Sequence, residues 1–435
     1  MKIFFILVAM VASAQDSYLI RNATIHPVTG PEIVNGSLLI ESGKITGIGA
    51  KLAAPKGVKV IDAKGMHAWP GMVNCATQIG LSEISSVRET NDTNEIGEFI
   101  PQVRAIVAVN PETEHILVAR ANGLTAVLTL PAAIAVGGGP GAPTAGQSIV
   151  RGQAAMIRLD GWTWEDLAMS QSAGMLVRFP AIQTVTVGFG GGGLAGRSEI
   201  PFVEAKRRYD AEMRKIDEFF EKARRYQQAK AAATANFLPD MQLEAMLPVL
   251  AGKTPLLIPA QRERGIREAI DFAEKHKVKL VLMDVRKPGA QLTRIAEKKI
   301  AVIVGQPTDL PMDDDDAYDA AYSLPGELHK AGIKFAFGTY DNQFARNLPF
   351  EAGFAVAYGL PMEAAWRALT IDAAEMFGLG ASTGSLEVGK SADLFLSDGD
   401  PLEVKTQVKM VFIQGRNVSL ENRQTRLYQK YMGRP

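Results

Sequence analysis

The middle of this 435-residue chain alternates amphipathic helices with short apolar strands. Pro111–Asn122 has the apolar spacing of a helix, Gly123 ends it, and Thr125–Leu130 follows as a buried strand. The same helix-then-strand unit recurs in the pairs 265–276 with 278–283, 292–299 with 300–304, and 324–330 with 334–337. Apolar strands that are joined through helices belong to parallel sheets covered on both faces. The pattern predicts an α/β fold with a parallel sheet, open or closed into a barrel.

The two ends of the chain differ from the middle, because short strand-like runs alternate there with turn residues. Such runs fill residues 18–61 and return at 392–396 and 408–415, which predicts one β-module composed from both ends. We therefore expect four segments and one insertion. These are a signal peptide at 1–15, a first β part at 16–70, a barrel at 71–375 with a charged helical insertion at 204–236, and a second β part at 376–435.

Residues 1–15 have the organisation of a secretory signal: Lys2, an apolar run, and Ala12-Ser13-Ala14 as a cleavage site. The apolar run is shorter than the roughly 18 residues that span a bilayer. We therefore expect an exported protein, periplasmic or extracellular, with no integral membrane segment after signal removal. The 47 basic and 47 acidic residues balance, which argues against nucleic acid as a partner. The single cysteine, Cys75, excludes an internal disulfide.

Four stretches carry a family resemblance when they are taken together and in order. They are Ile61–Gly65 running into Trp69–Val73, Gly80–Ile84, Ala365–Gly378 and Gly384–Leu394. In this order they resemble the metal-dependent amidohydrolase superfamily, especially its exported, imidazolonepropionase-like members. The resemblance covers almost the whole mature chain and implies a distorted (β/α)8 barrel with a composite β-sandwich formed from both chain ends. It also implies hydrolysis of non-peptide carbon–nitrogen bonds by a metal-activated hydroxide.

The residues at the family's metal-ligand positions depart from its pattern. The first-strand signature Pro-Gly-x-x-Asp-x-His-x-His appears here as Pro-Gly-Met-Val-Asn-Cys-Ala-Thr-Gln, so Ala76 and Gln78 replace the two histidines. A methyl group cannot ligate, and a neutral amide is a poor ligand for zinc-type ions. Pro259 replaces the histidine of a later strand, and the next strand ends at Asp284 without one. We predict no metal site and no cofactor.

The last barrel strand supplies the remaining site candidates. In Gly338-Thr339-Tyr340-Asp341, Tyr340 takes the place of the family's catalytic aspartate, and Asp341 follows one step later. A one-residue slip reverses the facing of a strand residue, so Asp341 can act as the base only if a bulge re-aims it. The candidate catalytic residue is Asp341, and the candidate substrate-binding residues are Gln78 and Tyr340. The family's middle-strand lysine or glutamate has no assigned position.

Three other features have structural explanations. Gly188–Gly193 matches a dinucleotide-loop pattern but lacks the helix that must follow at once. Asp313–Asp316 lacks the ligand spacing of a calcium loop and is interpreted as a solvated acidic turn. Strand alternation predicts that Cys75 faces the outer helices as a buried structural residue.

Three hypotheses for function remain. In the first, the protein is an exported amidohydrolase-superfamily member that has lost metal-dependent catalysis. Such a pseudoenzyme serves as a binding or partner subunit, with a small amide-type molecule or an intact homologue as partner, in a homo- or hetero-oligomer. In the second, it remains an active amidohydrolase with a metal-free or atypical site that uses Asp341, Tyr340 or Gln78. In the third, it binds a nucleotide through Gly188–Gly193.

Overall fold

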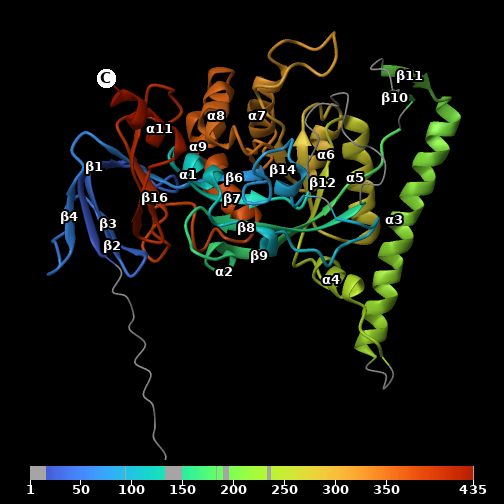
Figure 1. Cartoon of the computed structure of the whole chain (residues 1–435), viewed down its shortest axis with the longest axis horizontal. Coiled ribbons are helices and arrows are strands. Elements are labelled where there is room, and N and C mark those ends of the chain that lie inside the picture. Colours follow the sequence, from blue (N-terminus) through green and yellow to red (C-terminus); the bar gives the residue numbers. More distant parts are fainter. Residues whose placement is uncertain are drawn as a thin grey trace, which may run out of the picture.

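The computed structural model describes residues 16–93, 95–132, 149–182, 184–189, 195–232 and 237–434; the expected signal at 1–15 lies outside them. These described residues form two eight-stranded sheets and a separate two-stranded hairpin. Figure 1 shows a sheet built from the two chain ends on one side, a barrel in the middle, and a long helix at the far end. None of the described helices combines the length and the hydrophobicity of a membrane-spanning segment.

The central sheet is a nearly closed barrel, which confirms the expected α/β fold class. Its strands are β6 (Met72–Thr77), β7 (Leu124–Thr129), β8 (Val150–Arg158), β9 (Ala168–Val177), β12 (Leu256–Pro259), β13 (Leu280–Val285), β14 (Ala301–Val304) and β15 (Phe335–Ala336). Neighbouring strands are parallel except β8, which runs antiparallel to both β7 and β9. The barrel closes where the amide of Cys75 donates to the carbonyl of Phe337 (3.0 Å) and that of Tyr340 donates to the carbonyl of Ala76 (2.7 Å).

Helices cover the outside of the barrel. They are α1 (Glu114–Arg120), α2 (Trp164–Leu167), α4 (Met241–Leu250), α5 (Glu263–His276), α6 (Gln291–Glu297), α7 (Ala320–Lys330), α8 (Leu348–Ala357), α9 (Met362–Leu369) and α10 (Ile371–Met376). One set of strand residues packs under these helices, and the alternate set forms an inner cluster. Members of the inner cluster include Val73, Ala126, Leu128, Met156, Leu257, Met283, Ile303, Ala336 and Tyr340. The period-two alternation of strand side chains produces these two cores.

The second sheet combines both ends of the chain, as expected. It contains β1 (Tyr18–Ile25), β2 (Ile33–Glu41), β3 (Lys44–Gly49), β4 (Lys59–Asp62), β5 (His67–Pro70), β16 (Leu394–Ser397), β17 (Val408–Ile413) and β18 (Arg416–Val418). The two ends meet where β5 pairs antiparallel with β16, with Trp69 opposite Phe395. The chain then passes to the barrel at Gly71, where an added Cβ would lie 2.0 Å from Oγ1 of Thr125. Only glycine allows this close approach.

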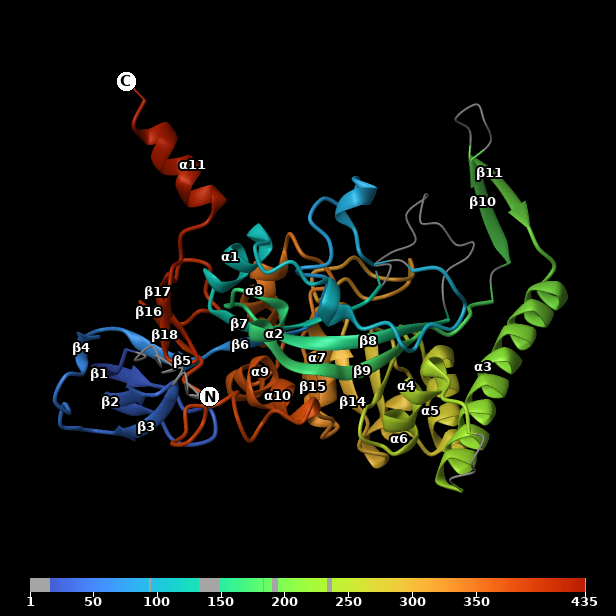
Figure 2. The same ribbon diagram turned by 60° about the horizontal axis from the view of Figure 1, so that its bottom comes forward.

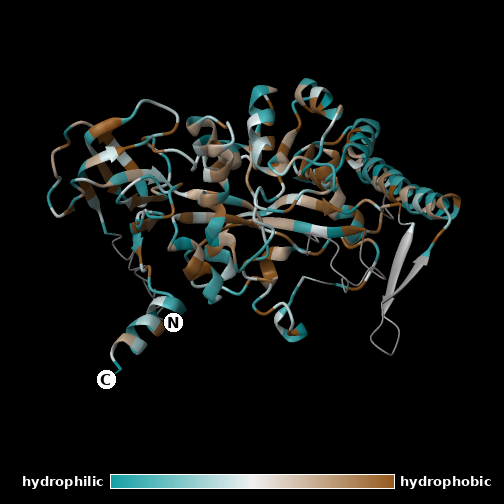
Figure 3. Cartoon of the chain, turned by 90° about the horizontal axis from the view of Figure 1, so that it is seen from above, coloured by the Kyte–Doolittle hydropathy of each residue, from teal (hydrophilic) through white to brown (hydrophobic). Residues whose placement is uncertain are grey.

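The long helix α3 (Phe202–Ala231) lies on the side of the barrel away from the composite sheet (Figure 2). It starts and ends earlier than the 204–236 expected from sequence, and residues 233–236 lie outside the described chain. Most of it is hydrophilic (Figure 3), but an apolar stripe faces the barrel. In this stripe the ring of Phe220 packs edge-on against that of Phe272 of α5, with 4.9 Å between ring centroids. The hairpin of β10 (Val185–Phe189) and β11 (Ala195–Glu199) precedes it.

Candidate functional site at the carboxyl end of the barrel

Parallel barrel strands bring their carboxyl ends to one face, where barrel enzymes build their sites. On β6 this end contains a bulge, because the register with β7 shifts between Asn74 and Thr77. Both Cys75 and Ala76 consequently belong to the inner cluster. The expectation that Cys75 faces the outer helices is therefore wrong, because strict alternation fails at a bulge. Burial raises the pKa of the Cys75 thiol, so it stays protonated and inert.

A hydrogen bond joins Asp284, at the end of β13, to Tyr340, in the segment that follows β15. The amide of Asp284 donates to the Tyr340 hydroxyl (2.5 Å), which in turn donates to the carbonyl of Ile303 (3.3 Å). Both residues have left-handed backbone conformations, with φ of 51° at Asp284 and 53° at Tyr340. Residues other than glycine rarely adopt such backbone angles unless their surroundings enforce them. Residues held in this conformation concentrate at functional sites. Tyr340 is thus fixed in the barrel interior by its hydroxyl group.

A buried polar network surrounds Asp284. One carboxylate oxygen accepts from Nε of Arg286 (2.8 Å), and the other accepts from Nε2 of Gln261 (2.5 Å). Nη1 of Arg286 also lies 2.6 Å from Oδ2 of Asp309, which follows β14. Burial raises the pKa of Asp284, and the charge of Arg286 and the Gln261 amide offset this only in part. We call Gln261, Asp284, Arg286 and Asp309 the inner network.

A carboxylic acid on α8 lies close enough to this network to interact with it electrostatically. Glu351 is 2% exposed, and its Oε2 has no hydrogen-bond partner among the residues that the structure describes. Burial, with smaller contributions from the negative charges of Asp309 and Asp341, raises the pKa of Glu351 to about 8. Glu351 therefore carries a proton at neutral pH, as carboxylic acids in general-acid catalysis do.

The structure places the sequence-predicted candidates Asp341 and Gln78 at the rim of the barrel. Oδ1 of Asp341 accepts from the amide of Phe344 (2.8 Å), so the carboxylate caps a turn. Gln78 is half-buried, and its backbone amide donates to Oδ1 of Asn342 (2.8 Å). The roles proposed for Asp341, Gln78 and Tyr340 stay predictions.

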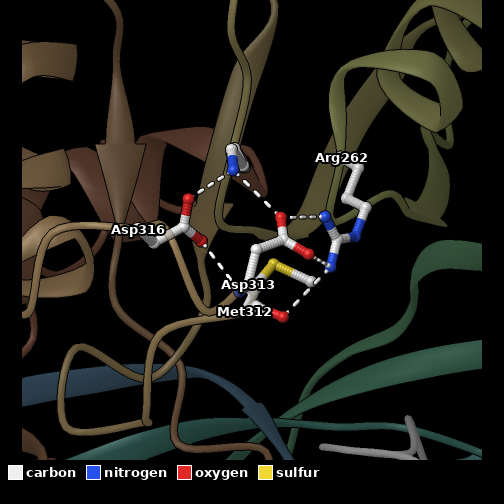
Figure 4. A network of polar contacts seen from close by, with 5 residues as sticks. Arg262, Met312, Asp313 and Asp316 are labelled. Atoms are coloured by element: carbon white, nitrogen blue, oxygen red, sulfur yellow. Dashed lines mark hydrogen bonds and ion pairs between the residues drawn. The ribbon is translucent and has the colours of Figure 1, made fainter.

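An outer set of ion pairs holds the loop after β14 (Figure 4). Arg262 binds Asp313 with both terminal nitrogens, at 2.5 and 2.9 Å, and Lys287 lies between Asp313 and Asp316. The hydrogen bonds from Arg262 and Lys287 lower the pKa of Asp313. The acidic turn is thus more than a solvated segment, because two of its carboxylates tie the loop to neighbouring strand ends. We call Arg262, Lys287, Asp313 and Asp316 the outer clamp.

A cavity of about 210 Å³ lies beneath this loop, between the inner network and the outer clamp. Its walls include Arg286 and Asp309 from the inner network and Asp316 from the outer clamp. Lys287 of the outer clamp and Glu327 of α7 also line it, together with apolar side chains such as Leu292 of α6 and Leu324 of α7. A concave apolar space with a few charged groups is the usual form of a small-molecule site.

The residues present do not fit a catalytic divalent metal. Ala76 is fully buried, and its Cβ lies 2.7 Å from the position that a Cβ added to Gly338 would take. No space for an imidazole exists there. Both oxygens of Asp284 are already bound within the inner network. All five histidines lie in described segments, and none follows a barrel strand. Among the described residues, the one cluster of carboxylates close enough to chelate an ion is Asp313, Asp315 and Asp316, which belongs largely to the outer clamp.

The glycine-rich segment Gly188–Gly193 falls partly outside the described residues, at 190–193. Its described part is the end of β10, and the next described residues form β11, which pairs antiparallel with β10. A phosphate-binding loop of the dinucleotide type requires a helix at that point. The described segments therefore do not provide the context that this motif needs.

Comparisons with known proteins agree with this architecture. The amidohydrolase family model matches residues 257–418. The solved amidohydrolase from Thermotoga maritima MSB8 has a TM-score of 0.76 and 25% identity, covering 92% of this chain and 99% of that protein. Amidohydrolase tasK of Hapsidospora irregularis is 24% identical over 91% of this chain, which spans only 42% of the length of that relative. Imidazolonepropionase of Syntrophobacter fumaroxidans is 47% identical over 82 residues, 18% of this chain and 19% of the relative.

Taken with the nearly closed barrel and the composite sheet, these matches establish the class of the protein. The chain belongs to the amidohydrolase superfamily.

Arg286 and Glu351 are not among the residues predicted from the sequence, although each carries a local signal. Arg286 comes two residues after Asp284, at the end of an apolar strand, where a barrel places functional side chains. Glu351 is the one charged residue in the otherwise apolar helix α8. A lone charge in an apolar helix indicates a buried ionisable group, but its partners depend on the tertiary fold.

Proposed function

We propose that this protein is a metal-independent member of the amidohydrolase superfamily that binds a small amide-type molecule at the carboxyl end of its barrel. The observation that carries the proposal is the position of Arg286. Its guanidinium pairs with Asp284 at the end of β13 and with Asp309 in the loop after the adjacent strand β14. A fixed cation in that position neutralises the carboxylates that a metal would need. The neighbouring cavity supplies space for a ligand.

The amide-type ligand is argued from the family's chemistry together with the groups at this site. The terminal amide of Gln78 at the rim can pair with an amide or hydroxyl group. The protonated Glu351 could donate to a carbonyl oxygen, since a neutral carboxyl group has one donor. Binding without turnover is what a pseudoenzyme of this family would show.

A panel of cyclic amides, N-acyl amino acids and short amides tests this function, with binding measured by calorimetry and turnover by product formation. We expect binding of at least one compound and the same negligible turnover with added Zn²⁺, Mn²⁺ or chelator. Metal-stimulated turnover would contradict the proposal. Leu324→Trp, which narrows the cavity, should weaken binding. Gln78→Ala should weaken it further only if the ligand extends to the rim, and Gln343→Ala, an exposed glutamine on the same rim, serves as the matched control for Gln78.

A weakly active hydrolase is the second candidate, because Glu351 has a pKa of about 8. A proton donor of this kind can accelerate a reaction about 10²- to 10⁴-fold without a metal. Here Glu351→Gln and Asp341→Asn should each abolish turnover on a compound that the wild type hydrolyses. Unchanged turnover in both variants would remove this candidate.

Export and a partner role extend the first proposal. The signal-like residues 1–15 support secretion, and amino-terminal sequencing of the mature protein should begin at Gln15 or close to it. A partner role beside an intact homologue would appear as co-purification with a His-x-His-containing relative from the native source. Recovery of the full-length chain from the cytoplasm would contradict export.

A further inference from the structure

The last helix, α11 (Arg423–Met432), projects away from both sheets (Figure 2). Its start is fixed by a capping box, in which Asn422 and Thr425 exchange side-chain and backbone hydrogen bonds. Glu114 holds the first turn, accepting from the amide of Arg423 (3.2 Å) and pairing with Arg426. Beyond this anchor, no residue of α11 is buried within the described chain.

A ten-residue helix without tertiary packing is only marginally stable in water, because most helical stability in proteins comes from burying an apolar face. Such a face is present on α11. Leu427, Tyr428, Tyr431 and Met432 lie at helical spacing and are between 39% and 67% exposed. The charged residues of this segment are all basic: Arg423, Arg426, Lys430 and Arg434, with no acidic residue from 422 to 434. The helix is therefore built to pack against a surface that is apolar and acidic.

The same chain carries such a surface around the start of α7 and the end of α8. The ring of Tyr322 stacks on that of Tyr358, with 4.8 Å between their centroids, and lies 5.5 Å from the ring centroid of Phe354. The ring of Tyr318 lies edge-on to that of Tyr358, with 6.4 Å between centroids. Tyr318 is 73% exposed and Phe354 46%. We call these four residues the aromatic patch.

The charge around the aromatic patch is opposite to that of α11. Asp314, Asp315 and Asp319 lie beside Tyr318 in the sequence, and Asp319 acts electrostatically on Tyr358. Neither residues 310–328 nor residues 347–361 contain a lysine or arginine. An aromatic, acidic face and an aromatic, basic helix are complementary in both apolar contact and charge.

We infer that α11 of one copy packs on the aromatic patch of a second copy, and that the exchange is reciprocal, giving a two-fold homodimer. In a two-fold interface each contact occurs twice, so two short helices together supply the buried surface that one could not. The acidic and basic groups at the edge of the contact set the partner and its orientation. This inference does not depend on the proposed function of the barrel.

Sedimentation velocity of the purified protein over about 1 to 100 µM tests the dimer, the range in which moderately stable complexes dissociate. Wild type should dimerise, and raising NaCl from about 50 to about 500 mM should weaken the dimer because surface charges are screened.

Three double variants locate the contact. Leu427→Asp with Tyr431→Asp, a helix variant, should be monomeric. Tyr318→Asp with Phe354→Asp, a patch variant, should be monomeric as well. Trp162→Asp with Leu238→Asp, which alters two apolar residues about 85% exposed elsewhere, is the matched control and should dimerise as wild type does.

Mixing the two monomeric variants decides the assignment. The helix variant retains an intact patch and the patch variant retains an intact helix, so a mixture can form one of the two contacts. We expect a mixed dimer with at least tenfold weaker affinity than wild type. A monomeric wild type, a dimeric helix variant, or no association in the mixture would overturn the inference. Binding of a monomeric wild type to anionic phospholipid vesicles would assign α11 to a membrane surface instead.

Discussion

The inner network and the outer clamp are built from the same kinds of residue, but they differ in their exposure to water. In the inner network the side chain of Asp284 is fully buried and that of Arg286 is 12% exposed. In the outer clamp the side chains of Arg262 and Lys287 are 47% and 45% exposed. Solvent screens the outer charges, whereas each inner charge depends on its partner. The inner network therefore limits what this face of the barrel can bind, and the outer clamp mainly positions a loop.

The largest expected effect comes from removing the internal cation. Arg286→Met keeps much of the side-chain volume but leaves Asp284 buried without a counter-charge. We expect the free energy of unfolding to fall by about 3–5 kcal/mol. Urea denaturation followed by circular dichroism measures this change. A loss below about 1 kcal/mol, the value typical of exposed pairs, would erase the difference between the two regions.

The pH dependence of stability gives the next largest effect, through Glu351. Its pKa rises on folding from 4.5 to about 8, so between these values the folded state holds a proton that the unfolded state has lost. This group consequently lowers stability as pH rises through that window, by up to about 1.4 kcal/mol per pH unit, and has no further effect above it. Glu351→Gln should remove that slope in denaturation series at several pH values. Glu375→Gln, an exposed pair partner of Lys334, is the control. Parallel pH profiles for wild type and Glu351→Gln would show that the carboxyl group is not buried as described.

Tyr340→Phe tests the link between the barrel strands. The amide of Asp284 loses its acceptor, and an unsatisfied buried donor costs about 1–3 kcal/mol. Tyr358→Phe changes a tyrosine outside the barrel and should have little effect on unfolding. Equal stabilities of the two variants would mean that the Tyr340 hydroxyl is not committed to this bond.

The smallest effect is expected in the outer clamp. Arg262→Ala breaks a bidentate pair with Asp313, but exposed pairs contribute only about 0–1 kcal/mol. Hydrogen exchange should increase in the loop at 306–316 while global stability stays nearly constant. A global loss comparable to that of Arg286→Met would contradict the proposed difference.

Much of the fold could be predicted from sequence, because apolar strands and amphipathic helices leave periodic patterns. The units around β7, β13, β14 and β15 were predicted in this way. The antiparallel direction of β8 was not predicted, because a strand's direction is set by its neighbours and leaves no local pattern.

The candidate site divides in the same way. The replacement of histidine by Ala76 and Gln78 is visible in the sequence, since it needs only alignment with a motif. The pairing of Arg286 with Asp309 joins two separate loops, and the raised pKa of Glu351 depends on burial. The bulge that turns Cys75 inward likewise comes from register with β7. Such features arise from tertiary contact and leave little trace in local sequence.

In the proposed function, this end of the barrel holds its own cation, Arg286, and no catalytic divalent metal. Elemental analysis by inductively coupled plasma mass spectrometry, on protein produced with Zn²⁺, Mn²⁺ and Fe²⁺ supplied, measures the bound metal. We predict metal far below one ion per chain, with the same residual amount in wild type and in Asp284→Asn. One tightly held ion per chain, lost in Asp284→Asn, would show that this end of the barrel is a metal site.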